Sequence, residues 1–289
     1  MNNTKKIFGS VFFIYFICVL LRVFEYFILR TDTSVIGEAV FHKIAGIVIL
    51  IFTCRLFGYS PADVSFEKNN AGYRLFSGII FGLICFTVAY IVEIIILCKA
   101  GSYQSLGLYV TSYSISGNLG NQTAFGFFVL CFAGNAINVI MEEGVFRGLF
   151  IKRIQEKYAY SVAAVISAVL FAFWHGVAPV RSFLDGDING FQLFMNCLIL
   201  ILSSGVVGFK YGLITKITGS GFMAMGDHFV NNTLVNILHV VSEGGADTYQ
   251  IIRISIAQTL SFIIVLIWYF YSKKNNPVEV PVSTESSNT

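Results

Sequence analysis

Two adjacent carboxylates, Glu142 and Glu143, and the guanidinium of Arg147 lie at the end of an apolar run that begins near Ala124. A charged side chain in the hydrocarbon of a membrane costs a few kcal/mol, so it normally faces the protein interior, pairs with another charge or lines a water-filled site. Residues four apart share one face of an α-helix, whereas neighbours point about 100° apart. We therefore expect Glu143 to pair with Arg147, which leaves Glu142 available as a base inside the membrane.

Two further apolar runs each carry a pair of side chains with the same four-residue spacing. Phe171 lies one helical turn before His175, so its ring can pack against the imidazole. His228 and Asn232 project from one face of another run, so an imidazole and a carboxamide could meet the same substrate atom. Asn231 points away from that face, and we expect it to form an interhelical hydrogen bond.

Together these runs supply one carboxylate and two imidazoles, which are the groups needed to activate water for attack on an amide. A glutamate paired with a histidine can take a proton from water and return it to the leaving amine. His228 and Asn232 could stabilise the negative oxygen of the tetrahedral intermediate. Two histidines and one glutamate are also a common ligand set for catalytic zinc. A divalent metal such as zinc, if present, would be bound by Glu142, His175 and His228.

The elements that must position these residues are membrane helices. The chain has 289 residues, of which 56% are hydrophobic and only 12% charged, a composition that is typical of a polytopic membrane protein and excludes one soluble domain. An α-helix needs about 20 apolar residues to cross the hydrocarbon. Eight runs approach this length, at about 7–29, 36–58, 75–98, 124–146, 159–180, 191–209, 222–241 and 251–271.

The distribution of Lys and Arg predicts the orientation, because cytoplasmic loops collect positive charge. If the N-terminus lies inside and the spans alternate, the outer loops hold only Arg30, Lys99 and Arg181. We therefore expect both termini in the cytoplasm. The net charge of +3 is small and the basic residues are scattered among loops, which argues against nucleic-acid binding.

The chain is expected to form a single transmembrane helical domain over residues 1–271, with the motifs in a core at about 124–241. The tail over 272–289 contains prolines and many small polar residues, which predict a disordered cytoplasmic segment. Short loops and the lack of a targeting extension indicate a multi-pass protein of the cell membrane, in a bacterial plasma membrane.

The relative depth of the polar residues raises a geometric problem. Straight spans put Glu142 and His228 in the cytoplasmic half of the membrane but His175 beyond the centre of its helix. Helix tilt, a later start of the fifth span, or a break near Gly176 and Pro179 could remove the mismatch.

Two other charged residues lie within the first run. Arg22 and Glu25 are three residues apart, which places them on one helix face, and we expect them to pair with each other.

In order along the chain, the motifs Glu-Glu-x-x-x-Arg, Phe-x-x-x-His and His-x-x-x-Asn resemble those of the CPBP family of intramembrane proteases. This family is related to the type II CAAX-prenyl endopeptidase and to bacterial bacteriocin-processing and immunity proteins. The resemblance implies an all-α bundle of about eight transmembrane helices, with a site inside the membrane that opens towards the cytoplasm. Members are commonly called metalloproteases, although a metal-independent glutamate mechanism is also attributed to the group. The cofactor is therefore left open.

The resemblance also implies a role for each motif residue. The water-activating residues would be Glu142 and His175, and the oxyanion-stabilising residues His228 and Asn232. Supporting roles would belong to Glu143, Arg147 and Phe171.

The expected function is that of an intramembrane endopeptidase, which hydrolyses a peptide bond in a membrane-embedded or lipidated peptide or protein. One alternative is a non-catalytic membrane protein of the same fold, which confers bacteriocin immunity or acts as a scaffold. Another is a proton-coupled transporter, in which Glu142, Glu93 and the histidines form a proton relay. The expected partners are the lipid bilayer and the substrate, whose identity the sequence does not specify; nor does it specify the oligomeric state.

Overall fold

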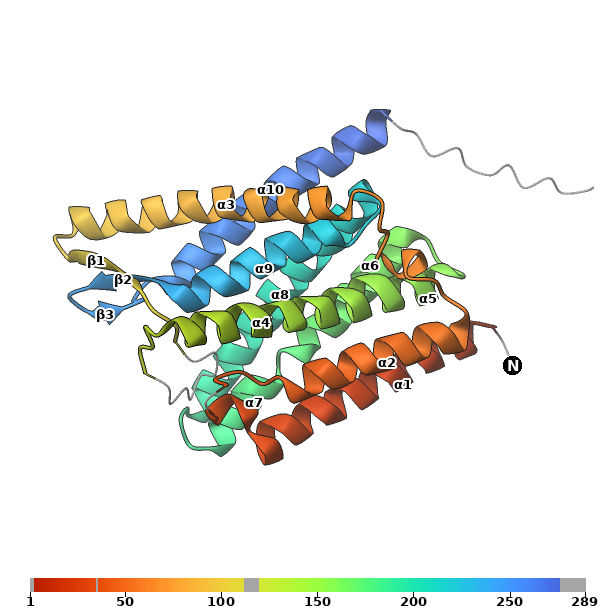
Figure 1. Ribbon diagram of the computed structural model, residues 1–289, viewed down its shortest axis with the longest axis horizontal. Helices are drawn as coiled ribbons and strands as arrows, with labels where there is room; N and C mark the ends of the chain where they lie inside the picture. Colours follow the sequence, from red (N-terminus) through yellow and green to blue (C-terminus); the bar gives the residue numbers. More distant parts are fainter. Residues whose placement is uncertain (1–2, 35, 112–119, 276–289) are drawn as a thin grey trace, which may run out of the picture.

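The computed structural model describes residues 3–34, 36–111 and 120–275, most of which are helical. The helices run back and forth along the long axis of the molecule (Figure 1). The long helices are α1 (Asn3–Phe24), α2 (Phe41–Phe57), α3 (Ala71–Lys99), α4 (Phe125–Glu142), α6 (Tyr160–Trp174), α8 (Gly190–Thr218), α9 (Phe222–Ile237) and α10 (Gln250–Asn275). The shorter helical segments are η1 (Glu25–Leu29), η2 (Thr31–Thr33), η3 (Ala62–Val64), η4 (Glu143–Phe150), α5 (Ile151–Gln155) and α7 (Val177–Leu184).

Each of the eight predicted runs contains a helix, but eight membrane spans are not confirmed. Among the described residues, six helical segments are long and apolar enough to cross a membrane: Thr4–Leu29, Ala71–Lys99, Phe125–Gln155, Tyr160–Leu184, Gly190–Thr218 and Gln250–Asn275. The other two helices, α2 and α9, have 17 and 16 residues. They are therefore shorter than the length of about 20 residues that spans the hydrocarbon.

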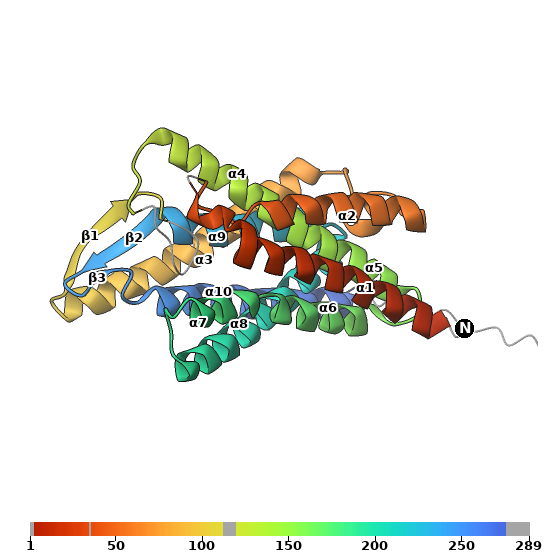
Figure 2. The ribbon, with the colours of Figure 1, turned by 90° about the horizontal axis from the view of Figure 1, so that it is seen from below.

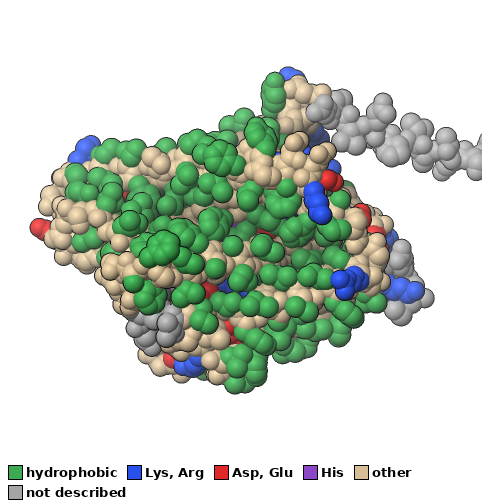
Figure 3. Space-filling view, viewed as in Figure 1, with side chains coloured by type: hydrophobic (Ala, Val, Ile, Leu, Met, Phe, Trp, Pro, Cys, Tyr) green, Lys and Arg blue, Asp and Glu red, His purple; other side chains and the backbone are tan. Residues whose placement is uncertain are grey.

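The two described ends of the chain lie at the same end of the bundle, where α1 begins and α10 ends (Figures 1 and 2). In Figure 3, hydrophobic side chains cover most of the visible face, and Lys and Arg side chains gather at this end. The arrangement fits termini that share one compartment. That this compartment is the cytoplasm stays a prediction. Most of the predicted disordered tail, residues 276–289, lies outside the described residues.

A small antiparallel sheet, which the all-α prediction omitted, lies at the opposite end of the bundle (Figure 1). It consists of β1 (Tyr103–Leu108), β2 (Leu238–Ser242) and β3 (Gly245–Ala246), in the order β1-β2-β3. The seventh run was predicted as helix to residue 241, but α9 ends at Ile237 and the chain continues as strand β2. Adjacent valines in β2 favour an extended backbone, and pairing with β1 satisfies its peptide groups.

The predicted fifth span is interrupted near Gly176 and Pro179, where a break was one of the expected possibilities. Helix α6 ends at Trp174, and α7 begins at Val177 after Gly176. Pro179 has no N–H to donate to the carbonyl of His175, four residues earlier, and its ring would clash with that carbonyl in a continuous helix. The break therefore has a local cause in the sequence.

Glycines allow α3 and α9 to pack closely, which fixes the helix that carries His228. A Cβ atom on Gly78 of α3 would lie 2.1 Å from the carbonyl oxygen of Met223, and one on Gly226 of α9 would lie 2.3 Å from that of Leu75. Backbone atoms cannot move aside as a flexible side chain can.

Gly226→Ala is expected to lower the free energy of unfolding by about 1–3 kcal/mol or more, because the methyl group overpacks the contact between α3 and α9. Thermal unfolding in detergent micelles measures the effect. Gly72→Ala is the matched control, since a Cβ at Gly72 meets nothing within 4 Å. Equal stability of the two variants would contradict the close contact.

Candidate active site

The carboxylate of Glu142 lies inside the bundle, at the end of α4, and its side chain is buried. The indole Nε1–H of Trp174 donates to Glu142 Oε1 at 3.1 Å, and a guanidinium nitrogen of Arg22 lies 4.0 Å from the same oxygen. The other oxygen, Oε2, lies 3.6 Å from Nε2 of His228. Glu142 is thus a buried carboxylate with one oxygen held by a hydrogen bond and the other facing an imidazole.

His228 lies between the two adjacent carboxylates. Its Nδ1 donates to Oε1 of Glu143 at 2.9 Å, while its Nε2 faces Glu142. The ring stacks on Tyr211, with a centroid separation of 4.9 Å and an interplanar angle of 21°. The predicted pair of Glu143 and Arg147 is present, with Nε 3.4 Å from Oε2. Glu143 has a second contact that helical spacing did not predict, because it also accepts from His228.

A change of helix type explains why neighbouring acids reach one ring. Glu143 begins η4, a π-helix that runs to Phe150, directly after α4 ends at Glu142. The i→i+5 hydrogen bonds of a π-helix put more residues into each turn, so neighbouring side chains diverge by less than in an α-helix. Such segments are rare and frequently lie at functional sites.

Arg147 is a buried cation that connects this cluster to α8. Its Nε donates to the carbonyl of Gly208 at 3.3 Å, and its guanidinium lies 3.9 Å from the centroid of the Phe171 ring. A Cβ on Gly208 would lie 3.0 Å from Nη2 of Arg147 and 2.9 Å from the Phe171 ring. A glycine at this position therefore leaves room for the arginine.

His175 is the C-cap residue of α6, at the break before α7. Its Nδ1 contacts the carbonyl oxygen of Phe171 at 2.9 Å. Because a carbonyl only accepts, Nδ1 carries the proton, and the neutral ring has its lone pair on Nε2. The predicted ring contact with Phe171 is confirmed, with centroids 4.7 Å apart. The Phe171 ring also lies edge-on to His228, with centroids 6.5 Å apart, and so connects His175 to the cluster.

The depth of His175 matches that of Glu142 because the fourth helical segment is longer than predicted. It continues through η4 and α5 to Gln155, so Glu142 lies thirteen residues from its end. His175 lies fifteen residues from Tyr160, at the start of α6 on the same side of the bundle. The apparent mismatch arose because the fourth run was predicted to end at residue 146.

The start of α9 lies at a level that brings His228 to the same depth. The carbonyl of Ser65 accepts a hydrogen bond of 2.8 Å from the backbone N–H of Gly221. The hydroxyl of Ser65 donates to the carbonyl of Arg147 at 3.5 Å. The loop before α9 therefore lies beside η4 inside the bundle. His228 lies seven residues after Gly221, and Glu142 lies five residues before Arg147, so both lie a similar distance from this contact.

Asn232 lies one turn beyond His228, at the end of a chain of polar groups. Lys210 of α8 donates to Oε1 of Gln258 at 2.8 Å, and Nε2 of Gln258 donates to Oδ1 of Asn231 at 2.8 Å. Nδ2 of Asn231 then donates to Oδ1 of Asn232 at 2.8 Å. An ammonium group only donates, so its end of the chain sets the direction of every amide. The NH2 group of Asn232 is therefore available to bond a group that is not part of this hydrogen-bond series.

The same chain confirms the predicted interhelical role of Asn231, because it connects α9 to α10. Lys210 is buried and also donates to Oδ2 of Asp227 at 2.7 Å. Asp227, which precedes His228 in the sequence, therefore compensates the charge of Lys210.

The three predicted metal ligands do not form a ligand cluster. Among the described residues, no three His, Cys, Asp or Glu side chains are arranged to hold a metal ion. Nδ1 of His175 is bonded to a carbonyl and Nδ1 of His228 to Glu143, so only Nε2 of each ring could ligate a metal. Glu142, His175 and His228 therefore do not fit a metal site in this arrangement.

Arg22 and Glu25 do not pair as predicted. Glu25 begins η1, another π-helix, and its carboxylate accepts from the ring and the backbone N–H of His42 at the start of α2. Arg22 instead lies over the ring of Trp174, 4.5 Å from its centroid, and beside Glu142. An arginine inside an apolar run was the available signal that α1 contributes to the site. Trp174 and Tyr211 carried no comparable signal, because aromatic residues are frequent throughout the chain.

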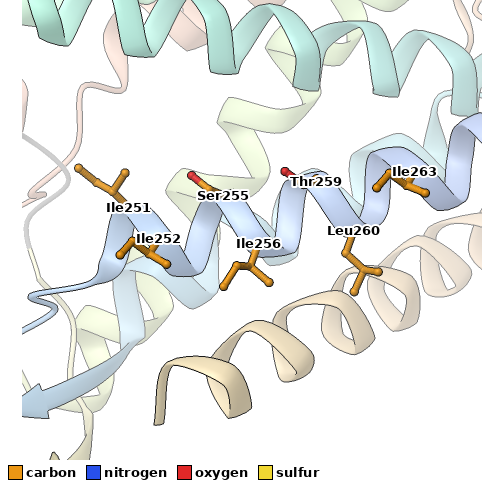
Figure 4. A pocket seen from close by; sticks show the side chains of 7 residues that line it. All are labelled: Ile251, Ile252, Ser255, Ile256, Thr259, Leu260 and Ile263. Atoms are coloured by element: carbon orange, nitrogen blue, oxygen red, sulfur yellow. The ribbon is translucent and has the colours of Figure 1, made fainter. Parts of the chain in front are cut away.

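A shallow hollow of about 510 Å³ lies along α10, and all its lining residues come from that helix (Figure 4). Its lining is mostly isoleucine and leucine, with the hydroxyls of Ser255 and Thr259. None of the predicted site residues lines it. Such an apolar face is what a helix in contact with lipid tails requires.

Comparison with protein families gives a match to part of the chain. Residues 124–234 match the family model described as Type II CAAX prenyl endopeptidase Rce1-like. The matched region runs from α4 into α9 and contains all three motifs, which confirms the resemblance found in the sequence. No curated protein matches the chain. The family match and the six apolar helices together suggest a multi-pass membrane protein with CAAX-type protease activity.

Proposed function

We propose that this chain is an intramembrane endopeptidase whose general base is Glu142, acting together with His175. The observation that carries the proposal is the buried Glu142 carboxylate, which faces His228 inside a bundle of apolar helices. Its substrate would be a membrane-embedded or lipidated peptide or protein, cleaved near the cytoplasmic side. The protein would lie in a bacterial plasma membrane with both termini in the cytoplasm.

In the first step, a water molecule attacks the carbonyl carbon of the scissile peptide bond. Oε2 of Glu142 or Nε2 of His175 accepts the water proton as the new C–O bond forms, and the carbonyl electron pair moves onto its oxygen. In the second step the C–N bond breaks, and the same proton passes to the leaving nitrogen. The products are a new carboxylic acid and a new amine, and the acid then loses its remaining proton to water or to the amine.

Support for this division of roles comes from the hydrogen bonds around each ring. Nδ1 of His175 is bonded to a carbonyl, which leaves Nε2 as an acceptor. His228 donates from Nδ1 to Glu143, so in its imidazolium form it would also donate from Nε2. Such a donor, with the NH2 group of Asn232, would stabilise the oxyanion.

Arg22 and Trp174 would orient the base. Both contact Oε1 of Glu142, so that Oε2 stays available for the water molecule. Arg22 belongs to α1, which lies outside the region matched by the family model. The N-terminal helices would therefore take part in the site.

Asn232→Ala is expected to lower kcat about 10²–10³-fold with a smaller change in KM, because an oxyanion donor acts mainly in the transition state. Gln258→Ala should lower kcat less, since it disturbs only the orientation of Asn232. Rates are measured on purified protein in detergent, with Asn121→Ala, an exposed asparagine, as the control. An unchanged kcat for Asn232→Ala would contradict the oxyanion role.

Removal of metal is expected to leave the rate unchanged, because the carboxylate and the two imidazoles do not form a ligand cluster among the described residues. The measurement is peptide cleavage before and after treatment with a zinc chelator, followed by metal analysis of the protein. Loss of activity on chelation, with recovery on adding zinc, would show that the ligands rearrange around a metal.

The proposed activity itself is tested on protein reconstituted in lipid vesicles. Hydrophobic peptides, including one with a prenylated C-terminal cysteine motif, serve as probes, and mass spectrometry identifies cleavage. Cleavage by the wild type that is lost in Glu142→Gln supports the proposal. Cleavage that persists in Glu142→Gln contradicts it.

A further inference from the structure

An amide-lined pocket of about 190 Å³ adjoins the candidate active site, and its lining comes from α4, α9 and α10 together with Glu38. Among the lining residues are Asn138 of α4 and Asn232 and Asn236 of α9. Asn138 lies four residues before Glu142, and Asn232 four residues after His228. Because residues four apart share a helix face, each helix presents an active-site residue and a pocket residue to the same side.

Two of these amides belong to largely buried residues, but their N and O atoms remain accessible. Asn138 is only 8% exposed and Asn236 only 7%. Within residues 3–34, 36–111 and 120–275, neither side chain forms a hydrogen bond. An accessible amide in a largely buried residue that has no protein partner normally bonds ordered water or a ligand. Both amides border the pocket, where a bound group could reach them.

The chemistry of the lining favours a neutral group that both donates and accepts hydrogen bonds. A carboxamide offers an N–H donor and a carbonyl acceptor, which complement the C=O and N–H of a peptide group. The acidic residue of the lining, Glu38, is paired with Lys43, so the pocket does not present an uncompensated charge. An ion would find no opposite charge there, whereas a polypeptide main chain would satisfy both amides.

We propose that this pocket binds the main chain of the substrate polypeptide, on one side of the scissile bond. The proposal rests on the proposed proteolytic function and names how that site holds its substrate. The main-chain groups of an α-helix are already bonded within the helix. A substrate segment must therefore be unwound to bond Asn138 and Asn236, so the pocket selects extended segments next to the cleavage site.

The test uses a photoreactive diazirine side chain of aliphatic size at Val235. This apolar residue belongs to the pocket lining, so all the amides stay in place. The protein also carries Glu142→Gln, which is expected to hold uncleaved substrate. It is irradiated in its native membrane, and the adducts are identified by mass spectrometry. The matched control carries the diazirine at Ile140, which is 39% exposed on the surface of α4.

We expect polypeptide adducts at position 235 and lipid adducts at position 140. Asn138→Leu and Asn236→Leu should each lower the yield of polypeptide adducts about threefold to tenfold, the effect of one net hydrogen bond. Asn121→Leu, the same change at an exposed asparagine, should leave the yield unchanged. Thermal unfolding of each variant separates a loss of binding from a loss of the fold. Because the two amides lie on different helices, the test can still be made with one variant if the other does not fold.

Lipid adducts alone at position 235, or a polypeptide yield that neither leucine variant lowers, would overturn the proposed pocket. Failure of the proteolytic function gives a different result. If Glu142 is not the base, polypeptide adducts at position 235 would still form, with similar yields in the wild type and in Glu142→Gln. If cleavage depends on Glu142 but no polypeptide adduct forms at position 235, the function stands and the pocket does not.

Discussion

Glu142→Gln is expected to lower the rate of peptide cleavage about 10²–10⁴-fold, the contribution of a positioned general base. Glutamine has nearly the same shape as glutamate, and its carbonyl oxygen can still accept the hydrogen bond from Trp174. It cannot take a proton from water, however. The fold should therefore persist while the chemical step fails, and kcat should fall much more than KM rises.

The measurement compares kcat and thermal unfolding for purified wild type, Glu142→Gln and the control Glu243→Gln. Glu243 is an exposed acid near the sheet, at the opposite end of the bundle from the termini. Wild-type kcat in the control together with a stable, inactive Glu142→Gln is the expected result. A Glu142→Gln variant that is folded and fully active would exclude Glu142 as the base.

Arg147→Ala is expected to lower the free energy of unfolding by about 3–5 kcal/mol, because removal of one partner leaves the other charge of a buried pair uncompensated. The orphaned group would be Glu143, which also accepts from Nδ1 of His228. The substitution further removes the contact of the guanidinium with Phe171 and the bond to the carbonyl of Gly208. The arginine therefore holds η4, α6 and α8 together.

Unfolding of Arg147→Ala is measured in mixed micelles titrated with a denaturing detergent. Arg55→Ala is the control, because Arg55 is exposed at the end of α2. The double variant Glu143→Leu, Arg147→Met should recover part of the lost stability, since apolar residues of similar volume can replace a buried pair. This double variant should nevertheless be inactive, because His228 loses its partner Glu143. A stability loss as small as that of Arg55→Ala would contradict the structural role of Arg147.

Much of the fold could be predicted because the bundle is formed by long apolar runs. Each predicted run contains a helix, and the pairing of Glu143 with Arg147 follows from helical spacing alone. The break after Trp174 was among the expected possibilities, because a proline cannot continue a helix without strain. Features that follow from helical periodicity could therefore be predicted from the sequence.

The features that could not be predicted depend on contacts between distant segments or on rare geometry. Periodicity does not distinguish an α-helix from the π-helix that starts at Glu143, although this difference brings both acids to His228. Arg22 and Glu25 have the spacing of a pair, but each finds a different partner on another helix. The sheet requires β1 to meet β2, more than a hundred residues away in the chain.

The cleavage of membrane polypeptides by Glu142-activated water is tested most directly by comparing membrane peptidomes from cells with wild-type protein and with Glu142→Gln. Membranes are incubated in water labelled with heavy oxygen, because hydrolysis places one water oxygen in each new C-terminal carboxylate. The proposed mechanism predicts labelled C-termini in the wild-type membranes that are missing with Glu142→Gln. The same labelled peptides in both membranes would contradict it.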